Sequence, residues 1–284
     1  MKRQFFILFI VFVLVSYLGA EKFQVIKHED TQKNLTFSQP SGPKEVRVDN
    51  IFGYIAVEGY SGQEINLKVH KTIKARNQDR YEKALQEVTL EITEEDNTID
   101  LYVDGPFRCQ EGDRHKYWNK DPGYQVHYDF ELQVPFQSQI LLKTVTAGDI
   151  TVTNVQGDFE VRNVNGKILL EDMGGSGTAH TVNGKVAVFF TSNPASDCSF
   201  KTINGDLDIY FKENLSADFR LKTFNGDILS DFPVTYLPFE PGQGERKDGR
   251  FVFKSSSFFG VRTGNGGPKV KMDTFNGDIL INKK

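Results

Sequence analysis

A ten-residue pattern of apolar and polar positions recurs in the second half of this 284-residue chain. It reads apolar-x-apolar-x-Thr-apolar-Asn-Gly-Asp-apolar and occupies residues 198–207, 219–228 and 270–279. Apolar residues alternate on both sides of the Asn-Gly pair, which is the periodicity of a β-strand. Glycine and asparagine tolerate a left-handed backbone, so the pair marks a sharp corner. The pattern therefore predicts short strands joined by tight corners.

The corners recur at a nearly constant spacing. Five corner glycines follow one another at nine-residue steps, and two more follow at steps of twenty-one. This recurrence favours a β-solenoid, because each coil buries its apolar face only by stacking on its neighbours. We expect coils of about 18–21 residues with two short strands each. The predicted corners are Gly148, Gly157, Gly166, Gly175, Gly184, Gly205, Gly226 and Gly277. The side chains predicted to stack inward are those of Val164, Val182, Ile203 and Phe224, and of Ile168, Val186, Leu207 and Ile228.

The first half of the chain has β patterning without the regular repeat. Residues 77–87 have helical spacing, with Asn77 or Asp79 as a cap. Residues 88–103 predict a hairpin, and residues 124–135 predict a long strand. Alternating apolar runs from Val46 to Val69 predict further strands, and Gly53 and Gly59 resemble degenerate corners.

The predicted organisation is one all-β domain with one short helix. Residues 21–44 are polar and predict a loose arm before the domain. The domain itself covers 45–284, with an irregular part at 45–139 and regular repeats at 140–284. The segment 232–269 interrupts the repeats, and the last repeat is expected to cap the end of the stack.

The N-terminus predicts export. Lys2 and Arg3 precede an apolar run at 5–18, which Gly19 and Ala20 follow. This is the pattern of a secretory signal peptide over residues 1–20, and the run is short for a membrane span. Leu18 at the −3 position leaves an uncleaved anchor as the alternative. No other segment is apolar enough to cross a bilayer, so the predicted location is periplasmic, at the cell surface or secreted.

Charge and cysteine content narrow the possible partners. The chain has a net charge of −4, which becomes −6 when Lys2 and Arg3 leave with the signal. This balance gives no argument for binding nucleic acid or an anionic membrane. An exported chain permits a disulfide between Cys109 and Cys198, although Cys198 also fills a repeat position that is apolar elsewhere.

The combination of features resembles the bacterial putative-adhesin family of β-strand-repeat proteins, a domain of unknown function. The resemblance rests on the export signal, an irregular β region with one helix, the Val134-Pro135 strand exit and the Thr-x-Asn-Gly-Asp-Ile units. It covers roughly residues 45–284, and the chain departs from it at 232–269. The resemblance implies an exported repetitive β fold. It supplies no catalytic residues.

Candidate catalytic chemistry is limited to corner aspartates. Asp206 and Asp227 are predicted to lie one coil apart, near the separation of a retaining glycosidase pair. The competing interpretation is that these aspartates form turns by accepting backbone N–H bonds. Calcium is not expected, because the position after the corner glycine, which is aspartate in some coils, is lysine at Lys167 and Lys185. The five histidines lack zinc-ligand spacing, so we predict neither a metal nor a cofactor.

The sequence therefore predicts an exported, non-enzymatic surface-binding protein with an unknown protein or glycan ligand. The alternatives are a polysaccharide-acting enzyme that uses the stacked aspartates, and a structural or regulatory envelope protein. Binding residues concentrate on loops held by a rigid scaffold. The candidate binding loops are 105–123, with Tyr117 and Trp118, and 232–269, with Phe258 and Phe259. Burial of these aromatic residues against the core is the alternative.

Overall fold

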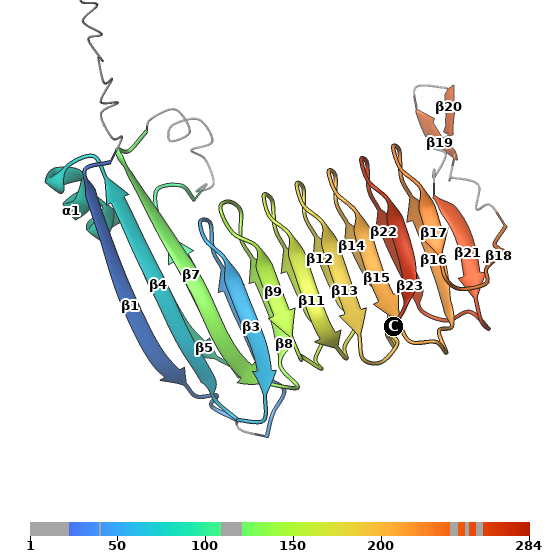
Figure 1. The fold of residues 1–284 in the computed structure, drawn as a ribbon, viewed down its shortest axis with the longest axis horizontal. Coiled ribbons are helices and arrows are strands. Elements are labelled where there is room, and N and C mark those ends of the chain that lie inside the picture. Colours follow the sequence, from blue (N-terminus) through green and yellow to red (C-terminus); the bar gives the residue numbers. More distant parts are fainter. Residues whose placement is uncertain (1–22, 40, 109–120, 239–243, 248–249, 254–257) are drawn as a thin grey trace, which may run out of the picture.

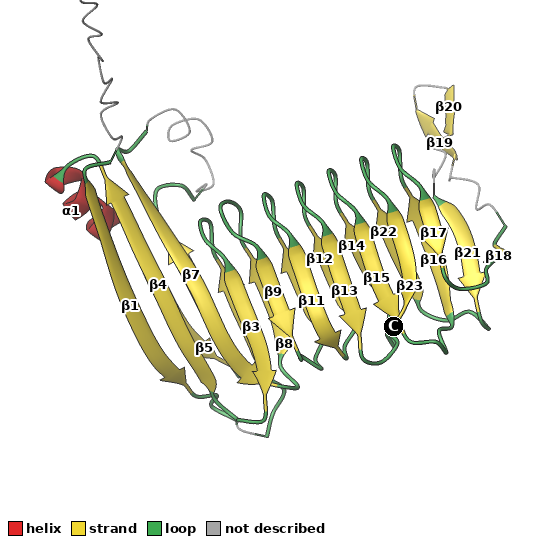
Figure 2. Cartoon of the chain, viewed as in Figure 1, coloured by secondary structure: helices red, strands yellow, loops and turns green. Residues whose placement is uncertain are grey.

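The computed structural model describes residues 23–39, 41–108, 121–238, 244–247, 250–253 and 258–284. Within these residues the fold is all-β with one helix. Two large sheets pack face to face along the length of the molecule (Figures 1 and 2). Their inner faces form one continuous core that runs from Phe37 to Ile281.

The first sheet has ten strands in mixed orientation. Its order is β1 (Val25–Leu35), β4 (Ile65–Ala75), β7 (Tyr124–Pro135), β3 (Ile55–Tyr60), β9 (Ile150–Thr153), β11 (Ile168–Met173), β13 (Val186–Phe190), β15 (Leu207–Phe211), β23 (Ile279–Lys283) and β17 (Ile228–Ser230).

The second sheet has eleven strands, also in mixed orientation. Its order is β18 (Thr235–Tyr236), β21 (Phe259–Thr263), β16 (Ala217–Lys222), β22 (Lys269–Asp273), β14 (Cys198–Lys201), β12 (Gly177–His180), β10 (Phe159–Arg162), β8 (Gln139–Lys143), β2 (Glu45–Asp49), β6 (Thr98–Asp104) and β5 (Thr89–Glu95). A separate two-stranded sheet joins β19 (Gly244–Lys247) to β20 (Arg250–Phe253).

Between β8 and β15 the chain alternates between the two large sheets. Each strand pairs in parallel with the strand two before it. Ile150, Ile168 and Val186 are in register at 18-residue steps, and Leu207 follows Val186 after 21 residues. The predicted spacing of the repeat is therefore the spacing of the strand register.

Two side-chain ladders hold the stacked corners together. The hydroxyl of Thr202 donates to the Gly184 carbonyl of the neighbouring corner at 2.9 Å, and Thr274 donates to Gly205 at 3.0 Å. The amide of Asn204 donates to Asn183 at 2.7 Å, and Asn276 donates to Asn204 at 2.8 Å. The corners also approach closely, because a Cβ at Gly205 would lie 2.2 Å from the Gly184 carbonyl oxygen. Glycine is therefore required at this corner.

The predicted inward ladder of Val164, Val182, Ile203 and Phe224 is wrong, because the polar residue before each of them takes the inward position. Ile203 is 40% exposed and Phe224 is 69% exposed, while Val164 and Val182 are half-buried. Strand alternation continues from buried Phe200 to buried Thr202, which turns the next residue outward. The second predicted ladder is correct for Ile168, Val186 and Leu207, which are buried, and wrong for Ile228, which is 36% exposed on the terminal strand β17.

The order of the last coils also differs from the prediction. The C-terminal strands β22 and β23 lie between the coil of β14 and β15 and the coil of β16 and β17. The expectation that the last repeat caps the end is therefore wrong. After β15 the chain forms β16 and β17 two coils further along the stack. The strands β22 and β23 then occupy the coil between β14/β15 and β16/β17.

The first half matches most of its predicted elements. Helix α1 (Gln78–Glu87) begins after Asn77, whose side chain accepts a hydrogen bond from the Arg80 N–H at 2.9 Å. β5 and β6 form the predicted hairpin, and β7 is the predicted long strand. Gly53 is a corner, because its carbonyl accepts from the Thr144 hydroxyl at 2.8 Å, whereas Gly59 lies inside β3. The predicted loose arm is wrong over residues 25–35, which form edge strand β1 along the whole of β4.

Candidate functional site

Exposed large apolar side chains concentrate at the C-terminal end of the sandwich. Eight of the ten such residues within the described part of the chain lie there, and Ile26 and Leu85 lie at the other end. We call the following residues the apolar end: Ile203, Phe224, Ile228, Leu229, Val234, Tyr236, Phe259 and Phe275.

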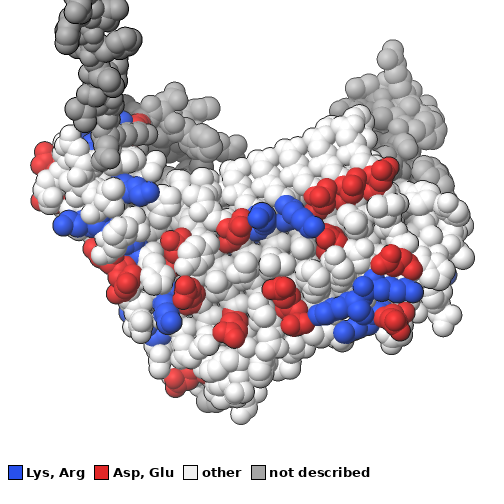
Figure 3. All heavy atoms as spheres, viewed as in Figure 1, with Lys and Arg blue, Asp and Glu red and all other residues white. Residues whose placement is uncertain are grey.

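The corner part of the apolar end is an ordered row. Phe224 and Phe275 stack with ring centroids 4.8 Å apart and an interplanar angle of 6°. Ile203 precedes them on the neighbouring corner, and the asparagine ladder fixes the spacing of all three coils. Figure 3 shows an uncharged strip along this corner edge, with a row of charged residues below it. These aromatic rings are therefore held at the surface by a rigid backbone.

The strand part of the apolar end lies where the two large sheets end at different strands. The eleven-stranded sheet extends to β21 and β18, while the ten-stranded sheet ends at β17. Tyr236 and Phe259 meet edge to face with centroids 5.2 Å apart and are 76% and 45% exposed. Phe258 is half-buried beneath the ammonium groups of Lys222 and Lys271. Of the two predicted loop residues, Phe259 therefore belongs to the exposed surface and Phe258 does not.

The prediction that Asp206 and Asp227 lie one coil apart is wrong. Asp278 lies between Asp206 and Asp227, because the C-terminal coil is inserted there. The Asp206 carboxylate accepts the N–H of Asp278 at 3.0 Å, and the Asp278 carboxylate accepts the N–H of Asp227 at 2.8 Å. Asp206 and Asp227 are thus two coils apart, about 10 Å by strand spacing. The Asp206 carboxylate therefore bonds to the backbone of the neighbouring coil, and its role in its own turn stays a prediction.

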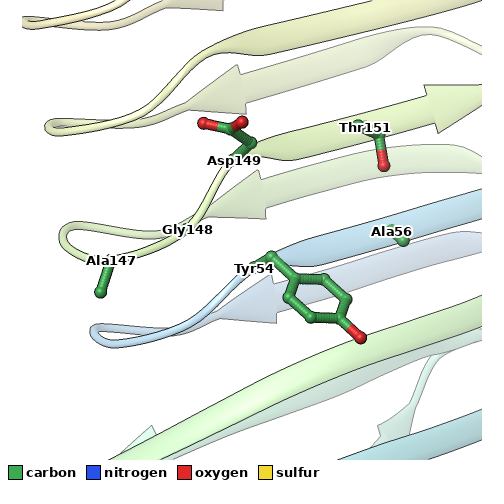
Figure 4. Close-up of a pocket in the computed structure, with 6 residues that line it drawn as sticks. All are labelled: Tyr54, Ala56, Ala147, Gly148, Asp149 and Thr151. Carbon is green, nitrogen blue, oxygen red and sulfur yellow. The ribbon is translucent and has the colours of Figure 1, made fainter.

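An open depression of about 570 Å³ lies where β3 meets β9 (Figure 4). Tyr54, Asp149 and Thr151 line it with Ala56, Ala147 and Gly148. The Tyr54 hydroxyl donates to Glu131 at 3.1 Å, and burial together with this carboxylate raises the pKa of Tyr54 to about 12. Asp149 accepts the backbone N–H of Lys167 at 2.7 Å. The Tyr54 hydroxyl and the Asp149 carboxylate are therefore engaged in contacts with neighbouring strands and corners.

Cys198 is a buried thiol in the core. Its sulfur accepts the Gly177 N–H at 3.4 Å and lies 3.7 Å from the Ser196 carbonyl oxygen. Burial raises the pKa of the Cys198 thiol to about 11. Cys109, Tyr117 and Trp118 lie outside the described residues, so the disulfide and the first binding loop stay predictions.

Metal ligands do not gather in the part of the chain that the structure describes. No group of three His, Cys, Asp or Glu side chains lies close enough there to hold an ion. Lys185, at a corner position that calcium would need, forms an ion pair with Asp208 at 2.7 Å. Across the same residues, no helix has the length and apolar character of a membrane span. The predicted signal at 1–20 falls outside the described residues.

Comparisons with known proteins give likenesses to solved structures alone. No family model and no curated protein matches the sequence. The chain is similar to a "putative cell adhesion protein" from Clostridium sporogenes, with 11% identity over 92% of this chain and 100% of that chain and a TM-score of 0.44. It is similar to a "putative adhesin" from Bacteroides fragilis, with 10% identity over 92% and 98% of the two chains and a TM-score of 0.40. A third is a "putative lipid binding protein" from Parabacteroides distasonis, with 12% identity over 90% and 96% and a TM-score of 0.28.

Proposed function

We propose that this chain is an exported, non-enzymatic surface-binding protein that engages its ligand through the apolar end. The observation that carries the proposal is the concentration of exposed apolar side chains on the C-terminal coils. A contiguous exposed apolar patch is typical of an interaction surface. Aromatic side chains held rigidly lose little conformational freedom when a partner binds.

We infer that residues 139–283 form a β-solenoid and that the whole sandwich folds as one domain. The parallel register and the threonine and asparagine ladders support the solenoid. The continuous core supports a single domain. A stack of this kind is a rigid spacer, which suits presentation of a binding surface at one end.

An enzymatic role receives less support. Asp278 separates Asp206 from Asp227; the Asp206 carboxylate accepts the N–H of Asp278, and the Asp278 carboxylate accepts the N–H of Asp227. A retaining glycosidase needs two carboxyl groups about 5 Å apart, with one of them protonated.

Export rests on the predicted signal, and the proposed ligand is a protein or glycan of the cell surface or envelope.

Binding variants at the apolar end test the proposal. The mature chain is screened by biolayer interferometry against purified extracellular-matrix proteins and a glycan array. The variant Phe224→Ser, Tyr236→Ser, Phe259→Ser should lose retention at least about tenfold on any ligand found, equivalent to about 1.4 kcal/mol. The matched control is Ile26→Ser, Leu85→Ser, which removes exposed apolar side chains at the opposite end. Equal retention by both variants, with unchanged melting temperatures, would overturn the proposal.

A further inference from the structure

The outer surface of the eleven-stranded sheet concentrates positive charge on the strands from β10 to β16. Strand register places Arg162, His180, Lys201, Asp273 and Lys222 in one row across β10, β12, β14, β22 and β16. The adjacent row contains Glu160, Lys271 and Arg220. We call these two rows the basic face. It has five Lys and Arg residues against two carboxylates, in a chain whose net charge is −4.

The two carboxylates do not neutralise the basic face. Glu160 lies 2.9 Å from Arg162 on its own strand. Asp273 lies 3.9 Å from Lys201, and only 19% of its side chain is exposed. Beside these two pairs, Lys222 and Lys271 add positive charge that the carboxylates of the face do not offset.

Two lysines of the basic face share one aromatic ring. The ammonium nitrogens of Lys271 and Lys222 lie 4.6 Å and 5.6 Å from the centroid of Phe258. Cation–π attraction holds each lysine in place, while the two like charges repel each other. An anionic group bound between them would relieve that repulsion. The ring thus positions two cations in advance of binding.

His180 lies between Arg162 and Lys201 in the first row of the basic face. Burial lowers the pKa of His180, and the neighbouring cations Arg162 and Lys201 lower it further. Lys271 acts in the same direction, and only Glu160 opposes it. The surrounding cations thus add to the effect of burial on the pKa of His180.

The dimensions of the basic face fit an extended ligand. Neighbouring strands are about 4.8 Å apart, so cations from β10 to β16 span roughly 20 Å along the stack. These cations lie on a regular open sheet, and they line neither of two depressions among the described residues. The large exposed apolar side chains lie on the corners and at the end of the sandwich, which disfavours insertion into a bilayer. A single aromatic ring covered by lysines also gives no platform for successive stacked bases.

We propose that the basic face binds a linear anionic polysaccharide that carries carboxylate or sulfate groups. The polymer lies along the stack axis, and its anionic groups pair with Lys201, Lys271 and Lys222 in successive coils. This surface is distinct from the apolar end, so each can fail without the other.

Charge reversal tests the proposal with the full mature chain. Affinity for polygalacturonate and dextran sulfate is measured by isothermal titration calorimetry at low and at physiological ionic strength, with neutral dextran as a reference. The variant Lys201→Glu, Lys222→Glu, Lys271→Glu should weaken binding at least about tenfold and flatten its salt dependence. The matched control, Lys27→Glu, Lys33→Glu, Lys68→Glu, makes the same change in net charge on β1 and β4 and should retain binding.

Four outcomes would overturn the proposal. The first is wild-type protein that binds neither anionic polymer. The second is equal weakening in both triple variants, which indicates only the overall charge. The third is tighter binding to duplex DNA or to phosphatidylserine vesicles than to either polysaccharide. The fourth is a face variant that retains full affinity with an unchanged melting temperature. If the face variant is unfolded, the single substitution Lys271→Gln replaces it and should weaken binding measurably.

Discussion

Replacing Ile203 by Asp tests whether the Ile203 side chain faces the core or the solvent. An inward Ile203 would bury an unpaired charge, which costs on the order of 3–5 kcal/mol. In the structure Ile203 is 40% exposed on the outer side of its corner, so the new carboxylate reaches water. The free energy of unfolding then falls by about three-fifths of the burial energy of an isoleucine side chain, or about 1–2 kcal/mol.

The matched comparison is Ile209→Asp in the same coil. Ile209 is fully buried in β15, so this substitution carries the whole cost of an unpaired buried charge. Urea and thermal unfolding of the two variants measure the difference. We expect Ile203→Asp to lower the melting temperature by about 2–8 °C and Ile209→Asp to abolish the cooperative transition. An Ile203→Asp variant as unstable as Ile209→Asp would refute the outward assignment.

Three further outcomes follow from the structure, and two from the sequence. Thr202→Val leaves the Gly184 carbonyl without its donor and should cost about 1–2 kcal/mol in urea unfolding; no change would argue against the threonine ladder. The Cys198 thiol should resist alkylation at pH 8 until the chain unfolds, and rapid labelling of folded protein would contradict its burial. Because its pKa rises from 9.0 to about 11 on folding, the thiol's contribution to stability is present below pH 9 and should be lost as pH rises toward 11. N-terminal sequencing of mature protein should find residues 1–20 removed, whereas an intact Met1 would indicate an anchor. Tyr117→Ala with Trp118→Ala should reduce ligand retention without lowering the melting temperature if 105–123 is a binding loop, and lost stability would assign it to the core.

The strands and corners of the regular repeats were predictable because the sequence encodes both locally. Alternation specifies the strand, and Asn-Gly specifies the corner. The facing of Ile203 was not evident, because an apolar residue beside a polar threonine looks like the core position. The deciding interaction is the Thr202 hydrogen bond to the next coil, which only the stacked arrangement provides. Strand β1 was missed for a related reason: almost every residue of this edge strand is exposed, so it has no apolar alternation.

The apolar end could be predicted only in part. Phe259 was singled out as a binding candidate from the aromatic content of the interrupting segment; it is exposed, and its role in binding stays a prediction. Phe224 was predicted to face the core, although it stacks on Phe275 at the surface. The basic face was invisible in the net charge, because it depends on the register that brings Lys201, Lys222 and Lys271 onto one side of one sheet.

The inserted C-terminal coil has a consequence for the order of folding. The segments 223–229 and 274–280 have the same seven residues, Thr-Phe-Asn-Gly-Asp-Ile-Leu. During synthesis the first of them emerges earlier, when the position above β14 and β15 is still vacant. It can occupy that position with the same threonine, asparagine and backbone contacts that the second makes there in the finished molecule. The nascent chain therefore has a competing arrangement of nearly equal local energy. When the first copy docks there, the segment 274–280 reaches its native place only by displacing it, so we expect completion of the stack to be the slow step of folding.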